Sequence, residues 1–255
     1  MKPKVTILGS GNVATHLAIA LANEADIVCV YNHNMAGASA LAERVGAIPT
    51  DNTDYITDDV DIHIIAVKDD AISELAQKIG RRDGLWVHTS GSVSQDVLSS
   101  ISDTYGVLYP MQTFSKDVPV NMGEVPLFIE ASDTETLDRI RQIASLISNN
   151  VHEADSALRS RLHIAAVFAC NFTNYLWGHA DDLLRRDGLS LEIMKPLIMA
   201  TLDKAIDITP KKGQTGPARR NDTKIIDRHL SMLSGETKEI YENISRLIVD
   251  KYNHQ

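Results

Sequence analysis

A glycine-rich turn near the N-terminus is the segment of this chain best suited to hold a ligand. The run Gly9-Ser10-Gly11-Asn12-Val13-Ala14 follows a short apolar stretch and opens into a helical pattern. In a Gly-x-Gly-x-x-Ala turn, the first glycine permits the tight turn and the second lets a pyrophosphate approach the backbone. The free N–H groups and the positive end of the helix then hold the anion. This spacing predicts a dinucleotide site at Gly9, Ser10, Gly11, Asn12 and Val13.

The end of the second predicted strand indicates which dinucleotide the site prefers. NAD-binding folds usually place a carboxylate about 20 residues past the glycines, where it binds the ribose hydroxyls. Here the strand ends in Tyr31-Asn32-His33-Asn34, which contains no carboxylate. A carboxylate would repel the extra phosphate of NADP, whereas Asn32 and His33 could donate hydrogen bonds to it. We therefore expect NADP rather than NAD, with Arg44 as a candidate arginine; the alternative is a plain polar turn.

Strand and helix patterns alternate through the first part of the chain. Apolar runs predict strands at 5–8, 26–31, 62–67, 85–88, 106–109, 126–130 and 150–153. Helical patterns lie between them at 12–23, 36–45, 70–79 and 133–147. Near-continuous apolar strands between helices indicate a parallel sheet that is covered on both faces. We therefore predict an α/β fold in which residues 1–154 form a Rossmann-type, doubly wound parallel sheet that binds the dinucleotide.

The strand patterns end near Asp155. Helices are predicted beyond it, at 158–185, 191–208, 225–233 and 237–252. We therefore predict that residues 155–255 form a second, smaller, all-helical domain for substrate binding and dimerisation. A domain of this size cannot bury such long apolar helices well by itself, so we expect a homodimer.

The composition limits the partners that the protein can bind. A net charge of −9 argues against nonspecific binding of nucleic acid, which needs a positive surface. Cys29 and Cys170 lack metal-ligand spacing, so we expect no metal and two free thiols in a reducing compartment. No apolar run approaches the ~18 residues of a membrane span, and the first strand begins too early for a signal peptide. We expect a cytoplasmic protein.

The first long predicted helix carries a candidate proton donor. At about 100° per residue, His163, Cys170 and Asn174 return to nearly the same face, and Asn171 is adjacent. Reduction of a carbonyl or an imine needs a proton, which a histidine can supply near neutral pH. An amide such as Asn171 could orient the substrate. The alternative is a core histidine, with asparagines that form hydrogen bonds between helices.

A basic loop at 210–221 could contact an anionic substrate. Arg219 or Arg220 could bind a carboxylate or a phosphate in a bidentate manner. The alternative is a solvated basic loop. Asp222, directly after this loop, is a candidate N-cap of the next helix.

The end of another predicted strand offers contacts with a cofactor. His88-Thr89-Ser90 closes that strand at its carboxyl end, where ligands bind in open α/β sheets. The hydroxyls there could meet the nicotinamide amide; alternatively, Ser92 or Ser94 caps the next helix. Tyr109 could line the same cleft as an acid, although its type favours a packed aromatic.

Two of these strand ends resemble a known superfamily. The segments Ile65 to Asp70 and His88 to Ser92 resemble the strand-end turns of the 6-phosphogluconate (β-hydroxyacid) dehydrogenase and pyrroline-5-carboxylate reductase superfamily. In that superfamily the first turn passes the cofactor and the second faces the nicotinamide. The resemblance implies cofactor contacts at Val67, Lys68 and Ser90.

Three further segments are more specific. The runs Tyr109 to Ser115, Leu162 to Asn171 and Thr215 to Asp222 resemble a group of bacterial Rossmann-like proteins with a helical C-terminal domain of unassigned function. Such proteins are usually described as NADP oxidoreductases. The resemblance covers nearly the whole chain and implies the fold and the cofactor, but no substrate. The hydroxyacid dehydrogenases carry a catalytic lysine on the comparable helix, where this chain offers His163 and Asn171.

These observations predict an NADP-dependent oxidoreductase. It would transfer a hydride between the nicotinamide and a small, anionic carbonyl or imine compound. One alternative is an NADP-binding redox sensor or scaffold without turnover. Another is a transferase that uses a different nucleotide on the same fold.

Overall fold

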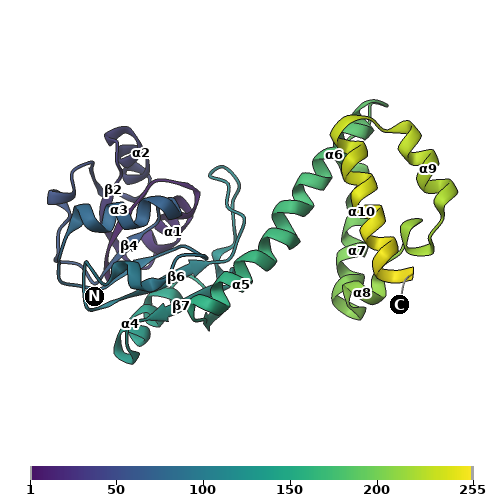
Figure 1. The fold of residues 1–255 in the computed structure, drawn as a ribbon. Helices are drawn as coiled ribbons and strands as arrows, with labels where there is room; N and C mark the ends of the chain where they lie inside the picture. The colour runs from purple at the N-terminus through teal and green to yellow at the C-terminus, as the bar shows by residue number, and fades with distance from the viewer. Residues whose placement is uncertain (1, 254–255) are drawn as a thin grey trace. The chain divides into compact units, whose positions relative to one another are not determined.

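The computed structural model describes residues 2–253, which divide after Cys170 into two compact units (Figure 1). The first unit contains an eight-stranded sheet in the order β3-β2-β1-β4-β5-β6-β7-β8. Its strands are β1 (Lys4–Leu8), β2 (Asp26–Tyr31), β3 (Ile48–Thr50), β4 (Ile62–Ile65), β5 (Trp86–His88), β6 (Tyr105–Pro110), β7 (Leu127–Ala131) and β8 (Val151–Glu153). Its helices are α1 (Asn12–Ala22), α2 (Met35–Val45), α3 (Asp69–Ile79), α4 (Thr134–Ser145) and α5 (Ser156–Ala166).

The sheet confirms the predicted α/β Rossmann-type fold, with one correction to its direction. Strands β1 to β6 are parallel, but β7 pairs with β6 in the antiparallel direction and β8 runs parallel to β7. The connection between β6 and β7 contains no long helix, so β7 can return beside β6. The apolar run of β7 resembles a parallel strand, and its direction is therefore not visible in the sequence.

Alternate residues of the strands build two cores, one on each face of the sheet. Ile7, Ile64 and Val87 belong to a core with helices α1 and α4. The neighbouring residues Leu8 and Ile65 point to the other face and pack with helix α3. This period of two is the reason that near-continuous apolar strands are buried on both sides.

Both edge strands of the sheet are short. The sequence pattern does not reveal strand β3, which has three residues and contains Pro49. Proline has no N–H to donate and is therefore tolerated where a strand pairs on one side only, as β3 does with β2. At the opposite edge, β8 also has three residues, and its Glu153 is paired with Arg141 of helix α4.

The second unit contains only helices among its described residues, as predicted. They are α6 (Thr173–Arg185), α7 (Lys195–Ile208), α8 (Pro210–Gly213), α9 (Thr223–Met232) and α10 (Gly235–Asn253). Asp222 accepts a hydrogen bond from the N–H of Ile225 at 3.3 Å, which confirms it as the N-cap of α9. The predicted loop 210–221 also holds the short helix α8 and one 3-10 turn.

A π-helical segment, Val167–Phe172, follows α5. In a π segment each hydrogen bond spans five residues instead of four, so the rotation per residue is smaller than in an α-helix. The predicted stripe of polar residues on this helix assumes a constant 100° per residue. That assumption fails within the segment, and the stripe is not a continuous α-helical face.

Candidate functional site

The predicted dinucleotide turn joins β1 to α1. Gly9 has a φ of 122°, and a Cβ there would lie 2.3 Å from the carbonyl oxygen of Ala66, so only glycine fits. Gly11 faces open space, since a Cβ there would meet no atom of the described residues within 4 Å. Helix α1 has no side-chain cap and no acidic residue in its first turn. The turn thus offers N–H groups and room for a pyrophosphate.

Neighbouring strands bring the other predicted cofactor residues to the same edge of the sheet. The N–H of Ala66 donates to the carbonyl of Leu8 at 2.7 Å, and the N–H of Thr89 donates to that of Ile65 at 3.1 Å. The carboxyl ends of β1, β4 and β5 therefore lie in line. Residues that follow these ends are the half-buried Val67, the exposed Lys68 and the buried Ser90.

Asn32 lies beside the glycine turn. A Cβ on Gly37 would lie 2.4 Å from Nδ2 of Asn32 and 2.8 Å from Oγ of Ser10, so α2 approaches the turn closely here. Asn34 accepts a hydrogen bond from the N–H of Gly37 at 2.7 Å and caps α2. His33 is exposed next to this cap. Asn32, His33 and Asn34 thus place polar groups, and no carboxylate, at the end of β2 beside the glycine turn.

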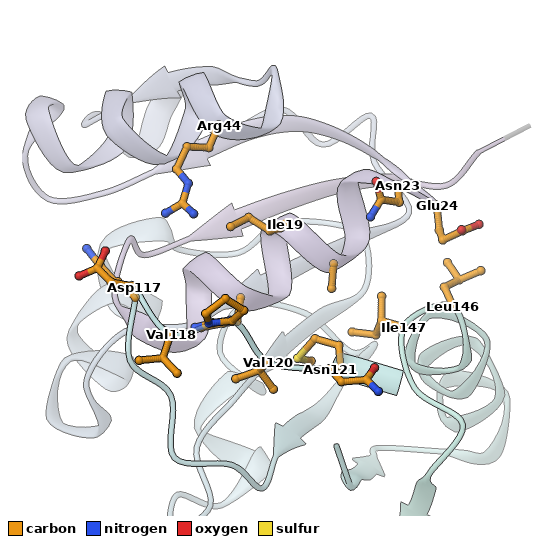
Figure 2. A pocket seen from close by; sticks show the side chains of 15 residues that line it. Ile19, Asn23, Glu24, Arg44, Asp117, Val118, Val120, Asn121, Leu146 and Ile147 are labelled. Carbon is orange, nitrogen blue, oxygen red and sulfur yellow. The ribbon is translucent and has the colours of Figure 1, made fainter. Parts of the chain in front are cut away.

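Arg44, the candidate arginine for the extra phosphate of NADP, does not lie beside Asn32 and His33. It lies in the last turn of α2, about 13 Å from the helix start at the usual rise per residue. Arg44 lines a separate hollow of about 630 Å³. Figure 2 shows it there with Ile19, Asp117 and Val118. His16, Ile19 and Ala20 of α1 line this hollow, and the glycine turn does not.

His88 has a structural role in the turn that follows β5. Its Nδ1 accepts a hydrogen bond from the N–H of Ser90 at 3.1 Å, and its Nε2 donates to the carbonyl of Ser94 at 3.3 Å. Burial, helped by the nearby Arg159 guanidinium, lowers the pKa of His88 to about 4. His88 is therefore neutral near pH 7 and fixes the shape of the turn. Ser94, in turn, caps the next 3-10 turn by accepting from the N–H of Asp96 at 3.3 Å.

His163 forms a hydrogen-bonded pair with Tyr109. The Tyr109 hydroxyl lies 3.1 Å from Nδ1 of His163. Burial and the Asp69 carboxylate raise the pKa of Tyr109, so the hydroxyl stays protonated and can donate a hydrogen bond to Nδ1. A neutral imidazole that accepts at Nδ1 carries its own proton at Nε2. The pair therefore presents an N–H donor from a half-buried histidine.

Gly91 provides the space for this pair. A Cβ on Gly91 would lie 2.8 Å from Cζ of Tyr109 and 2.9 Å from Nδ1 of His163. The pair thus packs directly on the turn after β5, beside Ser90. In this way the structure brings the candidate proton donor and one predicted cofactor residue together.

Three predicted site residues lie in the second unit. Asn171 is exposed in the π segment, at the first residue of that unit. The guanidinium of Arg219 lies 4.8 Å from the ring centre of Tyr252, a cation–π contact, whereas Arg220 is exposed. Arg220 is therefore the arginine with the freer side chain for binding an anion.

The sequence interpretation missed two charged residues that hold the site. Arg159, one helical turn before His163, is 1% exposed and ion-paired with Glu130 of β7. Their separation of 29 residues gives no periodic pattern that could reveal the pair. The type of Tyr109 favours a packed aromatic, but its hydroxyl also forms a hydrogen bond with His163.

Neither a metal centre nor a membrane span is found in the part of the chain that the structure describes. Within residues 2–253, no three His, Cys, Asp or Glu side chains gather as a set of metal ligands. No helix in that range combines the length and apolar character needed to cross a bilayer.

The chain matches two family descriptions. Residues 4–88 match a family described as NADP oxidoreductase, coenzyme F420-dependent, and residues 125–248 match a domain of unknown function, DUF2520. A comparison with curated proteins finds no match. A solved structure from Bacteroides fragilis, described as a putative NADP oxidoreductase, is 42% identical over 98% of both chains, with a TM-score of 0.91.

More distant structures share the fold. A Thermotoga maritima protein, TM1727, is 20% identical over 98% of this chain and 99% of its own, with a TM-score of 0.78. An imine reductase from Myxococcus stipitatus in complex with NADP⁺ is 17% identical over 99% and 93%, with a TM-score of 0.69.

The Rossmann-type sheet and its uncapped glycine turn are typical of a dinucleotide-binding protein. The chain belongs to the family of NADP oxidoreductases represented by the Bacteroides fragilis structure, in which this sheet precedes a helical C-terminal region.

Proposed function

We propose that the protein transfers a hydride between NADP and a small carbonyl or imine compound, with His163 as the proton donor. The observation that carries the proposal is the Tyr109–His163 pair on Gly91. Gly91 follows β5, at the same edge of the sheet as the glycine turn. His163, the proposed proton donor, thus lies near the edge where the dinucleotide would bind.

The residues of the first unit fit the cofactor. The backbone of Gly9, Ser10, Gly11, Asn12 and Val13 would hold the pyrophosphate, because α1 is uncapped and Gly11 leaves room. Asn32 and His33 would donate hydrogen bonds to the 2′-phosphate of NADP. Val67, Lys68 and Ser90 would contact the nicotinamide half of NADP. When bound, NADPH supplies the hydride to the electrophilic carbon of the C=O or C=N bond.

His163 then completes the reduction. As the double bond is reduced, the substrate oxygen or nitrogen gains an electron pair and accepts the proton from Nε2 of His163, while Nδ1 takes the hydroxyl proton of Tyr109; this leaves a neutral imidazole and a phenolate, which solvent reprotonates. Tyr109 keeps the ring in the required tautomer by donating to Nδ1. In the reverse direction, the neutral imidazole formed by this loss accepts the proton from an alcohol or amine. A proton donor of this kind contributes roughly 10²- to 10⁴-fold to a rate.

The proposal divides the chain functionally near Asp155. Residues 1–154 would bind the dinucleotide, and residues 155–255 would form the substrate and dimerisation domain. In that domain Asn171 would orient the substrate, and Arg219 and Arg220 would contact an anionic group on it. The exposed Arg220 supports this role more directly than Arg219, which contacts Tyr252.

We also propose that the protein is a homodimer. In the second unit, Leu197 is 64% exposed, Ile206 77% and Met232 70%. Of its described residues, Ala218 and Ser245 alone are buried. An exposed apolar surface of this extent indicates an interface, and a second copy of the helical domain would cover it.

Parallel calorimetric titrations with NADPH and NADH test the proposed cofactor site. We expect NADPH to bind at least tenfold more tightly than NADH. A preference for NADH would contradict the role of Asn32 and His33. Binding of neither would overturn the oxidoreductase proposal and favour a different nucleotide on this fold.

A substrate screen then tests turnover. The panel would contain aldehydes, 2-keto acids, cyclic imines and coenzyme F420, the last because of the family description that residues 4–88 match. Oxidation of NADPH would be followed at its nicotinamide absorbance. Tight binding of NADPH without oxidation by any of these compounds would favour the redox sensor or scaffold.

A further inference from the structure

A buried arginine links the proton-donor helix to the turn after β5. The side chain of Arg159, on α5, is 1% exposed. Its Nε donates to the carbonyl of Ser90 at 3.1 Å, and its Nη2 donates to the carbonyl of Val93. These two carbonyls flank Gly91, on which the Tyr109–His163 pair packs. Arg159 therefore binds the turn on both sides of Gly91.

Glu130 holds Arg159 in this position. Its carboxylate is ion-paired with Nη1 of Arg159. The same carboxylate accepts hydrogen bonds from the N–H and the hydroxyl of Ser156, both at 2.9 Å, in the first turn of α5. A carboxylate is favourable at the positive end of a helix. Glu130 thus fixes the start of α5 on β7 and orients the guanidinium at the same time.

Arg159 and His163 lie on the same face of α5, because residues four apart are neighbours on a helix surface. Arg159 therefore connects the face of α5 that carries His163 to the turn. Replacing a buried ion pair with apolar residues often leaves stability unchanged or increases it. A contribution to stability therefore does not explain why Arg159 and Glu130 are buried together. A requirement for one defined geometry explains the pair better.

We propose that Arg159 is a positioning residue for the reaction, with Glu130 as its orienting partner. It locks the Ser90–Val93 turn to α5, so that His163 stays on Gly91 with its Nδ1 at the Tyr109 hydroxyl. The effect on catalysis rests on the proposed function, whereas the effect on the His163 tautomer does not.

The first test reads the His163 ring directly. Nitrogen NMR of ¹⁵N-histidine-labelled protein distinguishes an imidazole protonated at Nε2 from the other tautomer. We expect one tautomer, Nε2–H, in the native protein and a mixture in Arg159→Lys, which keeps the charge but loses the planar fork. The milder Glu130→Gln variant should give a partial mixture. An unchanged single tautomer in both folded variants would overturn the proposal.

The second test compares two ligands. NADPH contains the nicotinamide half that would meet the Ser90–Val93 turn, whereas adenosine 2′,5′-bisphosphate lacks it. Arg159→Lys should weaken NADPH about tenfold or more and change binding of the bisphosphate less than twofold. Equal losses for both ligands would indicate a general structural defect and overturn the proposal, as would no loss for either.

A matched control and the native protein separate the two proposals. Arg141→Gln removes the exposed ion pair of α4 with Glu153 and should leave both readouts unchanged. If the native protein fails to bind NADPH, the proposed function fails while the tautomer test still decides the role of Arg159. If the native protein binds NADPH, and Arg159→Lys and Glu130→Gln match it in both tests, only the positioning role fails.

Discussion

The hydroxyl of Tyr109 lies 3.1 Å from Nδ1 of His163, although 54 residues separate them in the chain. Tyr109 lies near the end of β6 and His163 lies on α5, so the contact ties this helix to the strand end. Because the Tyr109 pKa is raised, the hydroxyl remains a donor across the neutral range. The free nitrogen of the ring is then Nε2.

Substitutions in this pair should lower turnover to different extents. His163→Ala removes the proton donor, and we expect kcat to fall roughly 10²- to 10⁴-fold with a small change in NADPH affinity. Tyr109→Phe keeps the ring but releases Nδ1, so we expect a loss of about tenfold, equal to 1.4 kcal/mol of transition-state stabilisation. Steady-state kinetics with a substrate from the screen measures both. Unchanged turnover in His163→Ala would remove the assigned role.

Gly91→Ala should displace the pair while leaving both of its residues unsubstituted. Its Cβ would lie 2.8 Å from Cζ of Tyr109, a distance that forces the ring or the turn to move. We expect kcat/KM to fall at least tenfold, and the free energy of unfolding to fall by about 1–3 kcal/mol, as for other overpacked sites. Gly178→Ala is the control, because a Cβ there meets no atom of the described residues within 4 Å. Equal behaviour of the two variants would contradict the prediction.

The two glycines of the dinucleotide turn should respond differently to alanine. Gly9→Ala combines a φ of 122° with a Cβ 2.3 Å from the Ala66 carbonyl, so the fold itself should be destabilised. Gly11→Ala meets no described atom of the protein and should keep the native unfolding temperature. It should instead weaken NADPH binding at least tenfold, because its methyl group enters the space of the pyrophosphate. Thermal unfolding with and without NADPH measures both effects, and native-like binding by Gly11→Ala would place the pyrophosphate elsewhere.

Two buried histidines should make the protein less stable in acid. Burial lowers the pKa of His63 and of His88 from 6.5 to about 4. The folded-state pKa lies below that of the unfolded chain, so protonation favours unfolding. Their contribution to stability is complete above pH 6.5 and is lost as the pH falls toward 4, by up to about 3 kcal/mol for each histidine. Urea unfolding at a series of pH values measures this loss.

His63→Phe isolates one of these contributions. Among the described residues, neither ring nitrogen of His63 has a hydrogen-bond partner, and the ring stacks on Trp86 at 3.8 Å. Phenylalanine can keep the stack and cannot titrate, so the variant should unfold with a flatter pH profile between 6.5 and 4. A profile identical to that of the native protein would show that His63 does not titrate in this range.

The proposed homodimer should be visible in the molar mass. Light scattering should give twice the chain mass of 28.0 kDa. Leu197→Glu places a charge on the exposed apolar surface of the second unit and should shift the protein toward the monomer. Ile48→Glu is the matched control, since Ile48 is also highly exposed, at 71%, but lies on β3. A native mass of one chain would contradict the dimer.

Local signals in the sequence predicted most of the fold. The strand Asp26–Tyr31 has the predicted bounds, and Gly46 ends α2 in the left-handed conformation, with a φ of 71°. These features depend on residues next to one another. The strand direction of β7 and the pairing of β3 depend on distant parts of the chain, and neither leaves a local pattern.

The site was less accessible to prediction for the same reason. The glycine turn and His163 could be found because each belongs to a local motif or to an apolar helix. Arg159 contacts the carbonyl of Ser90 across 69 residues, so no spacing rule connects the two. The π segment also changes the rotation per residue, and the predicted position of Asn171 on the helix face depends on that rotation.

The two short edge strands also affect how copies of this protein can associate. A long, unpaired strand edge offers N–H and C=O groups to another chain and promotes aggregation. Here Pro49 removes a donor from β3, while the ion-paired Glu153 places charge on β8. Both strands are too short to template a further strand well. Self-association through an extended cross-β sheet is therefore disfavoured, and concentrated solutions should resist fibril formation.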